Sequence, residues 1–132
     1  MTTLAMPRIT LALATMLSFM AFTPVSAEDY QKGLVVAETG DYTTAIKEFR
    51  PLAEEGDARA QISLARMYHK GVGVLQDNVM AHMWYNLSAA NGLKLAGENR
   101  DKLAKKMSNT AIEKAQAMAR ECMDSGYTKC GY

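Results

Sequence analysis

The spacing of hydrophobic residues along the chain is helical. Nowhere do apolar and polar residues alternate cleanly over five or more positions, as they would in a half-buried strand. The good helix formers Ala, Leu, Met, Glu, Lys and Gln dominate instead. The pattern predicts an all-α fold with helices at about 29–39, 42–55, 58–70, 78–91, 93–106 and 110–124.

The sequence also repeats itself at an offset of 36 residues. Six positions in order carry the same residue or the same aromatic character, namely Asp41 and Asp77, Ala45 and Ala81, Phe49 and Tyr85, Ala53 and Ala89, Gly56 and Gly92, and Ala60 and Ala96. Ala45, Phe49 and Ala53 are four apart, so they form one helical stripe in which the small residues allow close approach and the aromatic fills the gap. Glycine then ends each helix, because it adopts the left-handed cap conformation at least cost.

A third, degenerate unit follows at a shortened offset. Moving by 34 residues aligns Ala81 with Ala115 and Gly92 with Gly126, although the aromatic position is lost. Terminal repeats are expected to be atypical, because they cap the stack. The short glycine links between the helices suit antiparallel neighbours. We therefore predict an α-solenoid of about three antiparallel helix pairs.

Three local features bear on individual helices. Asp57 directly follows a glycine and is a natural N-cap for the next helix. Thr110 and Glu113 have the spacing of a capping box that opens the last helix. Pro51 lies inside the second predicted helix, and we expect it to kink that helix or to loosen its first half.

The first 27 residues have the pattern of a secretory signal peptide. One positive charge lies within residues 1–8, residues 9–22 are uncharged and mostly apolar, and small residues precede a predicted cleavage site after Ala27. A transmembrane anchor would need about 20 apolar residues, more than this stretch provides. We expect a protein of the periplasm or the extracellular space, with a repeat domain over residues 28–132.

Cys122 and Cys130 both lie in the exported part of this prediction. Because the predicted compartment is oxidising and the number of cysteines is even, we predict that the two form a disulfide. This bond would crosslink the C-terminal tail to the end of the last helix. The alternative is a redox or metal-binding pair. Seven residues separate the two cysteines, however, and this spacing matches neither a CxxC redox motif nor a zinc knuckle.

The charges of residues 28–132 are balanced. The whole chain has 15 Lys and Arg against 14 Asp and Glu, and removing residues 1–27 takes away only Arg8, which leaves 14 of each sign. Binding to DNA or RNA depends on a basic surface that neutralises phosphates. The composition therefore gives no support for nucleic acid as a partner, and no charge run predicts an anchor on anionic lipid.

The stretch from Leu64 to Gly92 carries the most specific pattern in the chain. It contains a Gly-x-Gly-Val loop at Gly71–Val74 and resembles the Sel-1-like repeat, a tetratricopeptide-type helix pair with a longer loop. Ala65, Asn78 and Met80 depart from the residues usual in that family. The positions that carry the repeat pattern are Gly40, Asp41, Ala45, Phe49, Ala53, Gly56, Ala60, Leu64, Tyr68, Gly71, Gly73, Val74, Asp77, Ala81, Trp84, Tyr85, Ala89 and Gly92.

This resemblance implies a scaffold whose stacked helices hold other proteins or peptides. A cysteine-rich secreted branch of the family, whose disulfide spacing is similar to that of Cys122 and Cys130, has been linked to β-lactam binding or hydrolysis. A β-lactam-directed protein is therefore an alternative, as is a host-interaction factor that uses the same surface. The apolar end of a short stack also leaves self-association open.

No catalytic or cofactor-binding pattern stands out. The only histidines are His69 and His82, no Ser or Cys nucleophile has a recognisable base at motif spacing, and the Ser-x-x-Lys signature is absent. Met80, His82 and Met83 have side chains that suit copper, but residues 80 and 82 point about 200° apart on a helix. We expect no enzyme activity, no cofactor and no metal.

The predicted binding surface is a groove on the concave side of the stack, lined by the first helix of each pair. The side chains expected to point outward there are polar or aromatic, and the unidentified protein or peptide partner would contact them. They are Tyr30, Gln61, Arg66, His69, Lys70, Asn99 and Arg100.

Overall fold

The computed structural model describes residues 27–132, and in this range all regular structure is helical. The helices are α1 (Ala27–Glu38), α2 (Tyr42–Glu54), α3 (Ala58–Lys70), α4 (Asn78–Ala90), α5 (Lys94–Ala104) and α6 (Asn109–Asp124). Every predicted helix is present, with ends within two residues of the prediction, so the all-α fold is confirmed. The predicted signal peptide, residues 1–27, lies outside the described residues except for Ala27.

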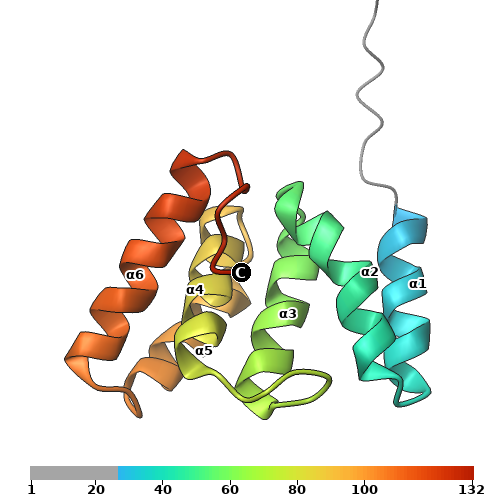
Figure 1. Cartoon of the computed structure of the whole chain (residues 1–132), viewed down its shortest axis with the longest axis horizontal. Coiled ribbons are helices and arrows are strands. Elements are labelled where there is room, and N and C mark those ends of the chain that lie inside the picture. The colour runs from blue at the N-terminus through green and yellow to red at the C-terminus, as the bar shows by residue number, and fades with distance from the viewer. Residues whose placement is uncertain (1–26) are drawn as a thin grey trace, which may run out of the picture.

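The helices stack side by side from α1 at one end to α6 at the other (Figure 1). α1 packs on α2, α2 on α3, and α3 on α4, as expected for antiparallel pairs in a solenoid. The third pair is different, because α5 and α6 both pack on α4 and α6 lies mainly along α4 rather than along α5. The last unit is therefore the atypical one, in agreement with its degenerate sequence.

The repeat is visible in the hydrogen bonds that end α2, α4 and α6. A backbone N–H one residue beyond each terminal glycine donates to a carbonyl five residues earlier, from Asp57 to Leu52, Leu93 to Ser88 and Tyr127 to Cys122. This is the long bond of a Schellman motif, which requires a left-handed residue before the donor. Gly56, Gly92 and Gly126 supply it with φ angles of +89°, +101° and +63°. The third unit thus keeps the helix end after losing the aromatic residue.

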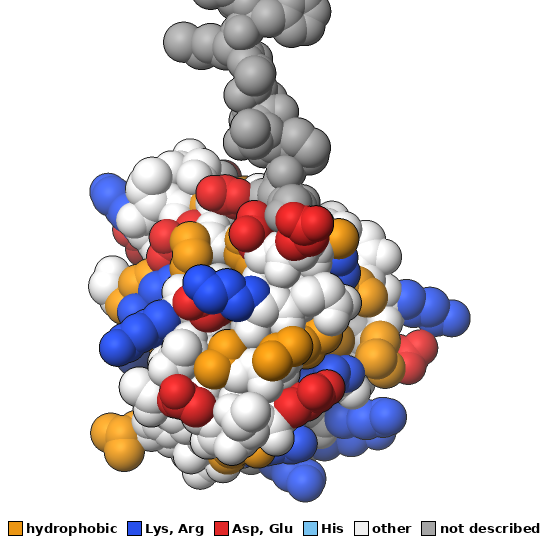
Figure 2. Space-filling view, turned by 90° about the vertical axis from the view of Figure 1, so that its right-hand side faces the viewer, with side chains coloured by type: hydrophobic (Ala, Val, Ile, Leu, Met, Phe, Trp, Pro, Cys, Tyr) orange, Lys and Arg blue, Asp and Glu red, His pale blue; other side chains and the backbone are white. Residues whose placement is uncertain are grey.

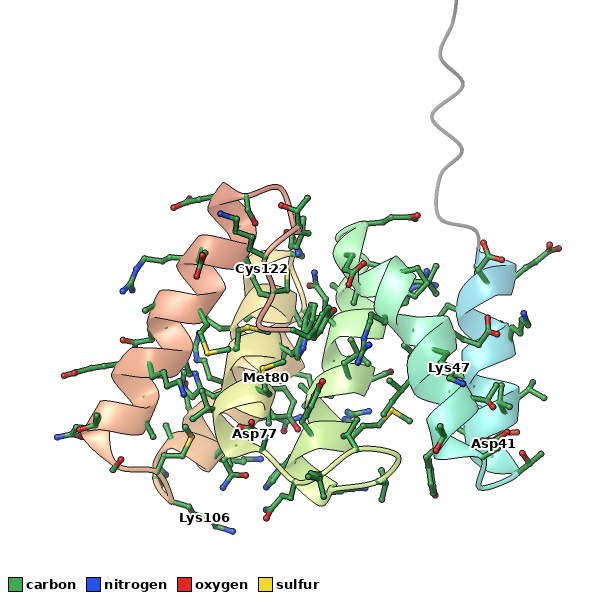
Figure 3. The ribbon with its side chains drawn as sticks, viewed as in Figure 1. Asp41, Lys47, Asp77, Met80, Lys106 and Cys122 are labelled. Carbon is green, nitrogen blue, oxygen red and sulfur yellow. A yellow bond between two sulfur atoms is a disulfide. The ribbon has the colours of Figure 1, made fainter. Side chains whose placement is uncertain are left out.

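Aspartates begin three of the helices. The side chains of Asp41 and Asp77 accept hydrogen bonds from the backbone N–H of Thr44 and Met80, which are equivalent positions 36 residues apart. Figure 3 shows both aspartates toward the lower edge of the molecule, one on each of the two units. Asp57 caps α3 by accepting from two backbone amides, as predicted.

One of the two remaining local predictions, the cap of the last helix, is wrong. α6 is capped by Ser108, whose Oγ accepts from the backbone N–H of Ala111, so the predicted capping box at Thr110 and Glu113 is wrong. Thr110 already lies inside the helix, because Ser108 provides the earlier oxygen acceptor. α2 runs from Tyr42 to Glu54 with Pro51 inside it, as predicted, and a kink at the proline stays a prediction.

The core runs along the predicted stripe. Ala45, Phe49 and Ala53 are each at most 1% exposed, and Phe49 packs its ring against Gly33 of α1, where a Cβ atom would overlap it. Trp84 is fully buried in α4. The other large side chains buried to the same degree are Leu64, Met83, Leu87 and Leu103.

The chain after α6 folds back over α4. A disulfide joins Cys122 to Cys130, as predicted, and both cysteines are buried. The tail passes close to Met80 (Figure 3), and a side chain at Gly131 would meet both Met118 and Met80. The Tyr132 ring then stacks on Trp84 with centroids 6.2 Å apart. The tail is therefore part of the cover of the core.

Removing this disulfide is expected to destabilise the protein. The double substitution Cys122→Ala with Cys130→Ala should lower the free energy of unfolding by about 2–3 kcal/mol, because the bridge closes a short loop and restricts the unfolded chain. Urea unfolding followed by the fluorescence of Trp84, the only tryptophan, measures the change. A reductant should destabilise the wild type and leave the variant unchanged. Equal stability of the two proteins would contradict the prediction.

Candidate functional site

Two adjoining cavities open on one face of α3. Arg66 and Lys70 line both of them, four residues apart on the exposed side of the helix. This spacing corresponds to about 6 Å along the helix axis. We call the two cavities together the Arg66 groove.

The first cavity is mainly apolar. It has a volume of about 180 Å³ and lies among α1, α2 and α3. Phe49 and Met67 are nearly completely buried beneath it, and Val72 of the following loop lines its side. The remaining lining residues are Leu34, Ala37, Tyr42 and Ser63, with Arg66 and Lys70 shared with the second cavity.

The second cavity is polar and cationic. It has a volume of about 250 Å³ and lies among α3, α4 and α5. Its lining consists of Arg66, His69, Lys70, Tyr85, Asn99 and Lys102, with no Asp or Glu. The His69 ring stands edge-on to Tyr85, with centroids 6.5 Å apart. Burial raises the pKa of Tyr85, although Arg66 opposes this change.

The cations of the groove lack acidic partners. Arg66, Lys70 and Lys102 take part in no ion pair among residues 27–132, and all three are exposed. Elsewhere in the same range, Lys32 pairs with Glu48 and Arg59 pairs with Asp57. The cavity on α6, by contrast, has both signs of charge in its lining. The Arg66 groove is therefore a concentrated positive site, although the charges of residues 28–132 balance as a whole.

The ends of α3 place these cations. Asp57 starts the helix, and Gly71, with a φ of +66°, ends it directly after Lys70. His69 and Lys70 thus occupy the last turn, where the helix dipole favours positive charge. On α5, Asn99 and Lys102 are three residues apart, so both face the same side of that helix.

The structure brings four of the seven predicted surface residues together. Arg66, His69, Lys70 and Asn99 line the cationic cavity. They come from α3 and α5, the first helices of the second and third pairs, and the apolar cavity extends the site to α1. Cavities are therefore present beside the first helices of the pairs, with α2 and α4 also in their lining, and their use as a binding surface stays a prediction.

Three predicted surface residues lie elsewhere. Gln61 was expected to point outward, which is wrong because it is fully buried. Its amide Nε2 donates to the carbonyl of Ala53 at 3.0 Å, and its Oε1 accepts from Asn91 at 2.9 Å. A polar side chain at the start of α3 thus joins the ends of α2 and α4, which its residue type alone did not indicate.

Tyr30 and Arg100 are also outside the groove. The Tyr30 ring packs 5.4 Å from that of Phe49, and its hydroxyl is hydrogen bonded to Ser63 at 3.2 Å. Arg100 donates from Nη1 to Asn86 and pairs with Asp101. Both side chains are therefore engaged in contacts within the protein.

Sequence reasoning missed several groove residues. The most important is Lys102, whose position three residues after Asn99 could have placed it on the same stripe of α5. The apolar lining had no comparable signal, because Leu34, Ala37 and Val72 look like ordinary core residues until the gap between α1 and α3 is known.

The suggested soft-metal residues are packing residues. Met80, His82 and Met83 are 6%, 3% and 0% exposed. Within residues 27–132 no three His, Cys, Asp or Glu side chains come close enough together to hold a metal ion. His82 is a titratable group in a dry environment, and its Nδ1 has no hydrogen-bond partner among the described residues.

This burial predicts a pH dependence of stability. Desolvation, and then the positive charge of Arg100, lower the pKa of His82, with Asp101 opposing them. In the unfolded chain, His82 takes up a proton below its ordinary pKa of about 6.5, whereas in the folded chain burial opposes its protonation. The free energy of unfolding should therefore fall as the pH drops from about 7 to about 5. His82→Gln should flatten this dependence in urea titrations. The lowered pKa of Asp57 acts only at more acidic pH, so it does not obscure the test. An unchanged slope in the variant would show the explanation to be wrong.

The open α1 end of the stack bears on self-association. Figure 2 looks at this end and shows a short strip of hydrophobic side chains among charges of both signs. Val35 of α1 is 60% exposed. Association of two copies remains a prediction.

Among residues 27–132, no helix combines the length and apolar character needed to cross a membrane.

The fold and the repeated helix ends define the class of protein as a helical-repeat solenoid. The Sel1 repeat family model matches residues 58–93, so the stretch that contains α3 and α4 is a Sel1 repeat, as its resemblance indicated. This unit supplies Arg66, His69, Lys70 and Tyr85 of the groove. Searches among curated proteins and among solved structures gave no significant match.

Proposed function

We propose that this protein is an interaction module that binds a segment of another protein in the Arg66 groove. The helical-repeat fold with its Sel1 repeat is of a kind used for protein–protein interaction. The observation that carries the proposal is the pair of adjoining cavities that share Arg66 and Lys70. Each cavity is smaller than the roughly 300 Å³ typical at the lower end for small-molecule pockets, so single side chains fit them better.

The proposal includes export and a role in binding rather than catalysis. Export is supported by the pattern of residues 1–27 and by the disulfide between Cys122 and Cys130, since such bonds persist in oxidising compartments. The groove contains one histidine, His69, and no Asp, Glu or Cys side chain that would serve with it as a base or nucleophile. The periplasm or the extracellular space is therefore the proposed place of action.

Crosslinking capture tests the proposal. Tagged protein is crosslinked in its own cell envelope, and captured partners are quantified by mass spectrometry. Arg66→Glu with Lys70→Glu should reduce recovery of the partner about tenfold or more, because attraction becomes repulsion at both positions. The matched control, Lys94→Glu with Lys114→Glu, makes the same change of charge at exposed positions outside the groove.

Circular dichroism establishes that both variants keep their helices. A partner lost only with the groove variant supports the proposal. A partner recovered equally with all three proteins would place binding elsewhere on the molecule.

A further inference from the structure

We propose that the partner segment is an acidic peptide with one bulky apolar side chain close to its carboxylates. This inference rests on the proposed function and specifies the chemistry of its ligand. The apolar cavity would receive the hydrophobic side chain, and the cationic cavity would receive the carboxylates.

The apolar cavity suits one hydrophobic side chain. Its floor is formed by Phe49 and Met67, which are 1% and 5% exposed, so a guest side chain would contact a well-packed surface. Leu34 and Val72 extend the apolar wall. Burying a Leu, Phe or Met side chain is favourable enough to anchor a segment when other contacts fix its position.

The cationic cavity suits carboxylates. Arg66, Lys70 and Lys102 contribute three positive charges, and no lining residue is acidic. Because these cations have no ion-pair partner among residues 27–132, a ligand carboxylate does not have to displace an internal one. Arg66 has the fork of N–H donors that binds a carboxylate with two hydrogen bonds, and Asn99 adds a neutral amide.

The two residues that line both cavities set the distance between the apolar side chain and the carboxylates of the ligand. Arg66 and Lys70 border both cavities, so an anchor in the apolar cavity and a carboxylate in the cationic one are separated by little more than one side chain. An extended peptide advances about 3.3 Å per residue. The acidic residues should therefore lie within one to three residues of the anchor, on its α5 side.

The chain's own charge balance favours a peptide over a nucleic acid. A polyanion would require a broad basic surface, whereas residues 28–132 contain 14 basic and 14 acidic side chains, and the three cations of the groove lie in one cavity with no acidic lining residue. The apolar cavity beside these cations has no counterpart in recognition of phosphate backbones. Tighter binding of a single-stranded oligonucleotide than of the peptide would contradict the inference.

The test uses synthetic fluorescein-labelled peptides and the full folded protein. The parent peptide has one Phe flanked by Glu residues in a Gly-Ser background. One derivative replaces Phe by Ala, and another replaces every Glu by Gln. Fluorescence anisotropy should show that each derivative binds about tenfold more weakly than the parent, and that salt weakens the parent more than the Gln derivative.

Three protein variants separate the two cavities. Arg66→Glu with Lys70→Glu should abolish the preference for Glu over Gln, while Lys94→Glu with Lys114→Glu should retain it. Ala37→Leu places a larger side chain in the lining of the apolar cavity, so it should weaken the Phe peptide and leave the Ala peptide unchanged. Trp84 fluorescence and circular dichroism show whether each variant is folded.

The outcomes are separable from those of the proposed function. Parent and Gln peptides of equal affinity, or tighter binding of an oligonucleotide, would overturn the acidic-peptide assignment. If cellular capture still depended on Arg66 and Lys70, the groove would remain the binding site and only the ligand class would be wrong. Equal loss of peptide binding in the groove and control variants would show nonspecific charge attraction and would also overturn the inference.

Discussion

Replacing Trp84 by Ala is expected to lower the free energy of unfolding by about 3–5 kcal/mol. Trp84 is fully buried in α4, the helix that contacts α3, α5 and α6, and it lies beneath Tyr132 of the tail. Truncation would leave a cavity where several units of the stack meet. A domain of about 100 residues has roughly 5–15 kcal/mol of total stability, so the loss is a large part of it.

The measurement for Trp84→Ala is urea unfolding followed by circular dichroism, because the variant contains no tryptophan. Leu75→Ala is the matched control, since Leu75 is 91% exposed and its removal should change stability little. Similar losses in the two variants would contradict the view that α4 is the centre of the core.

Gly73→Ala is expected to destabilise the protein by more than the roughly 1–2 kcal/mol of a left-handed alanine alone. Gly73 has a φ of +71°, and a Cβ atom there would lie 2.6 Å from the carbonyl oxygen of Tyr42. The obstacle is the backbone at the start of α2, which cannot rotate away as a flexible side chain can. The α3–α4 loop would have to move, and with it Val72 in the wall of the apolar cavity.

Gly40→Ala isolates the contribution of backbone conformation. Gly40 has a φ of +84°, but nothing lies within 4 Å of an added Cβ atom. Chemical denaturation of both variants should show a clearly larger loss for Gly73→Ala. If the two losses were equal, the contact between the loop and Tyr42 would have no energetic importance. Peptide binding by Gly73→Ala should also weaken, whereas Gly40→Ala should bind like the wild type.

The fold could be predicted because short-range signals decide it. Helical spacing and the glycines at 56, 92 and 126 mark helix ends that depend on local backbone bonds, and those bonds recur in all three units. The packing of the last unit could not be read in the same way. Whether α6 lies along α5 or α4 depends on contacts between distant residues and on the tail that Cys130 fixes over α4.

The candidate site was predicted only in part. Arg66, His69 and Lys70 were assigned to the surface as polar side chains of the first helix of a pair, and they line the cationic cavity. Gln61 was assigned to the surface because it is polar, although partners eight and thirty residues away in the chain satisfy its amide within the core. The apolar cavity was not foreseen, since it arises from a gap between helices rather than from any one residue.

The most direct test of the Arg66 groove as the binding surface is position-specific photocrosslinking in cells. A photoreactive side chain is placed at Ala37 or Lys102 in the groove, and at Lys114 or Gln116 on the exposed side of α6. The groove account predicts that Ala37 and Lys102 crosslink to the same partner and that the α6 positions do not. Crosslinks to that partner from α6, with none from Ala37 or Lys102, would contradict it.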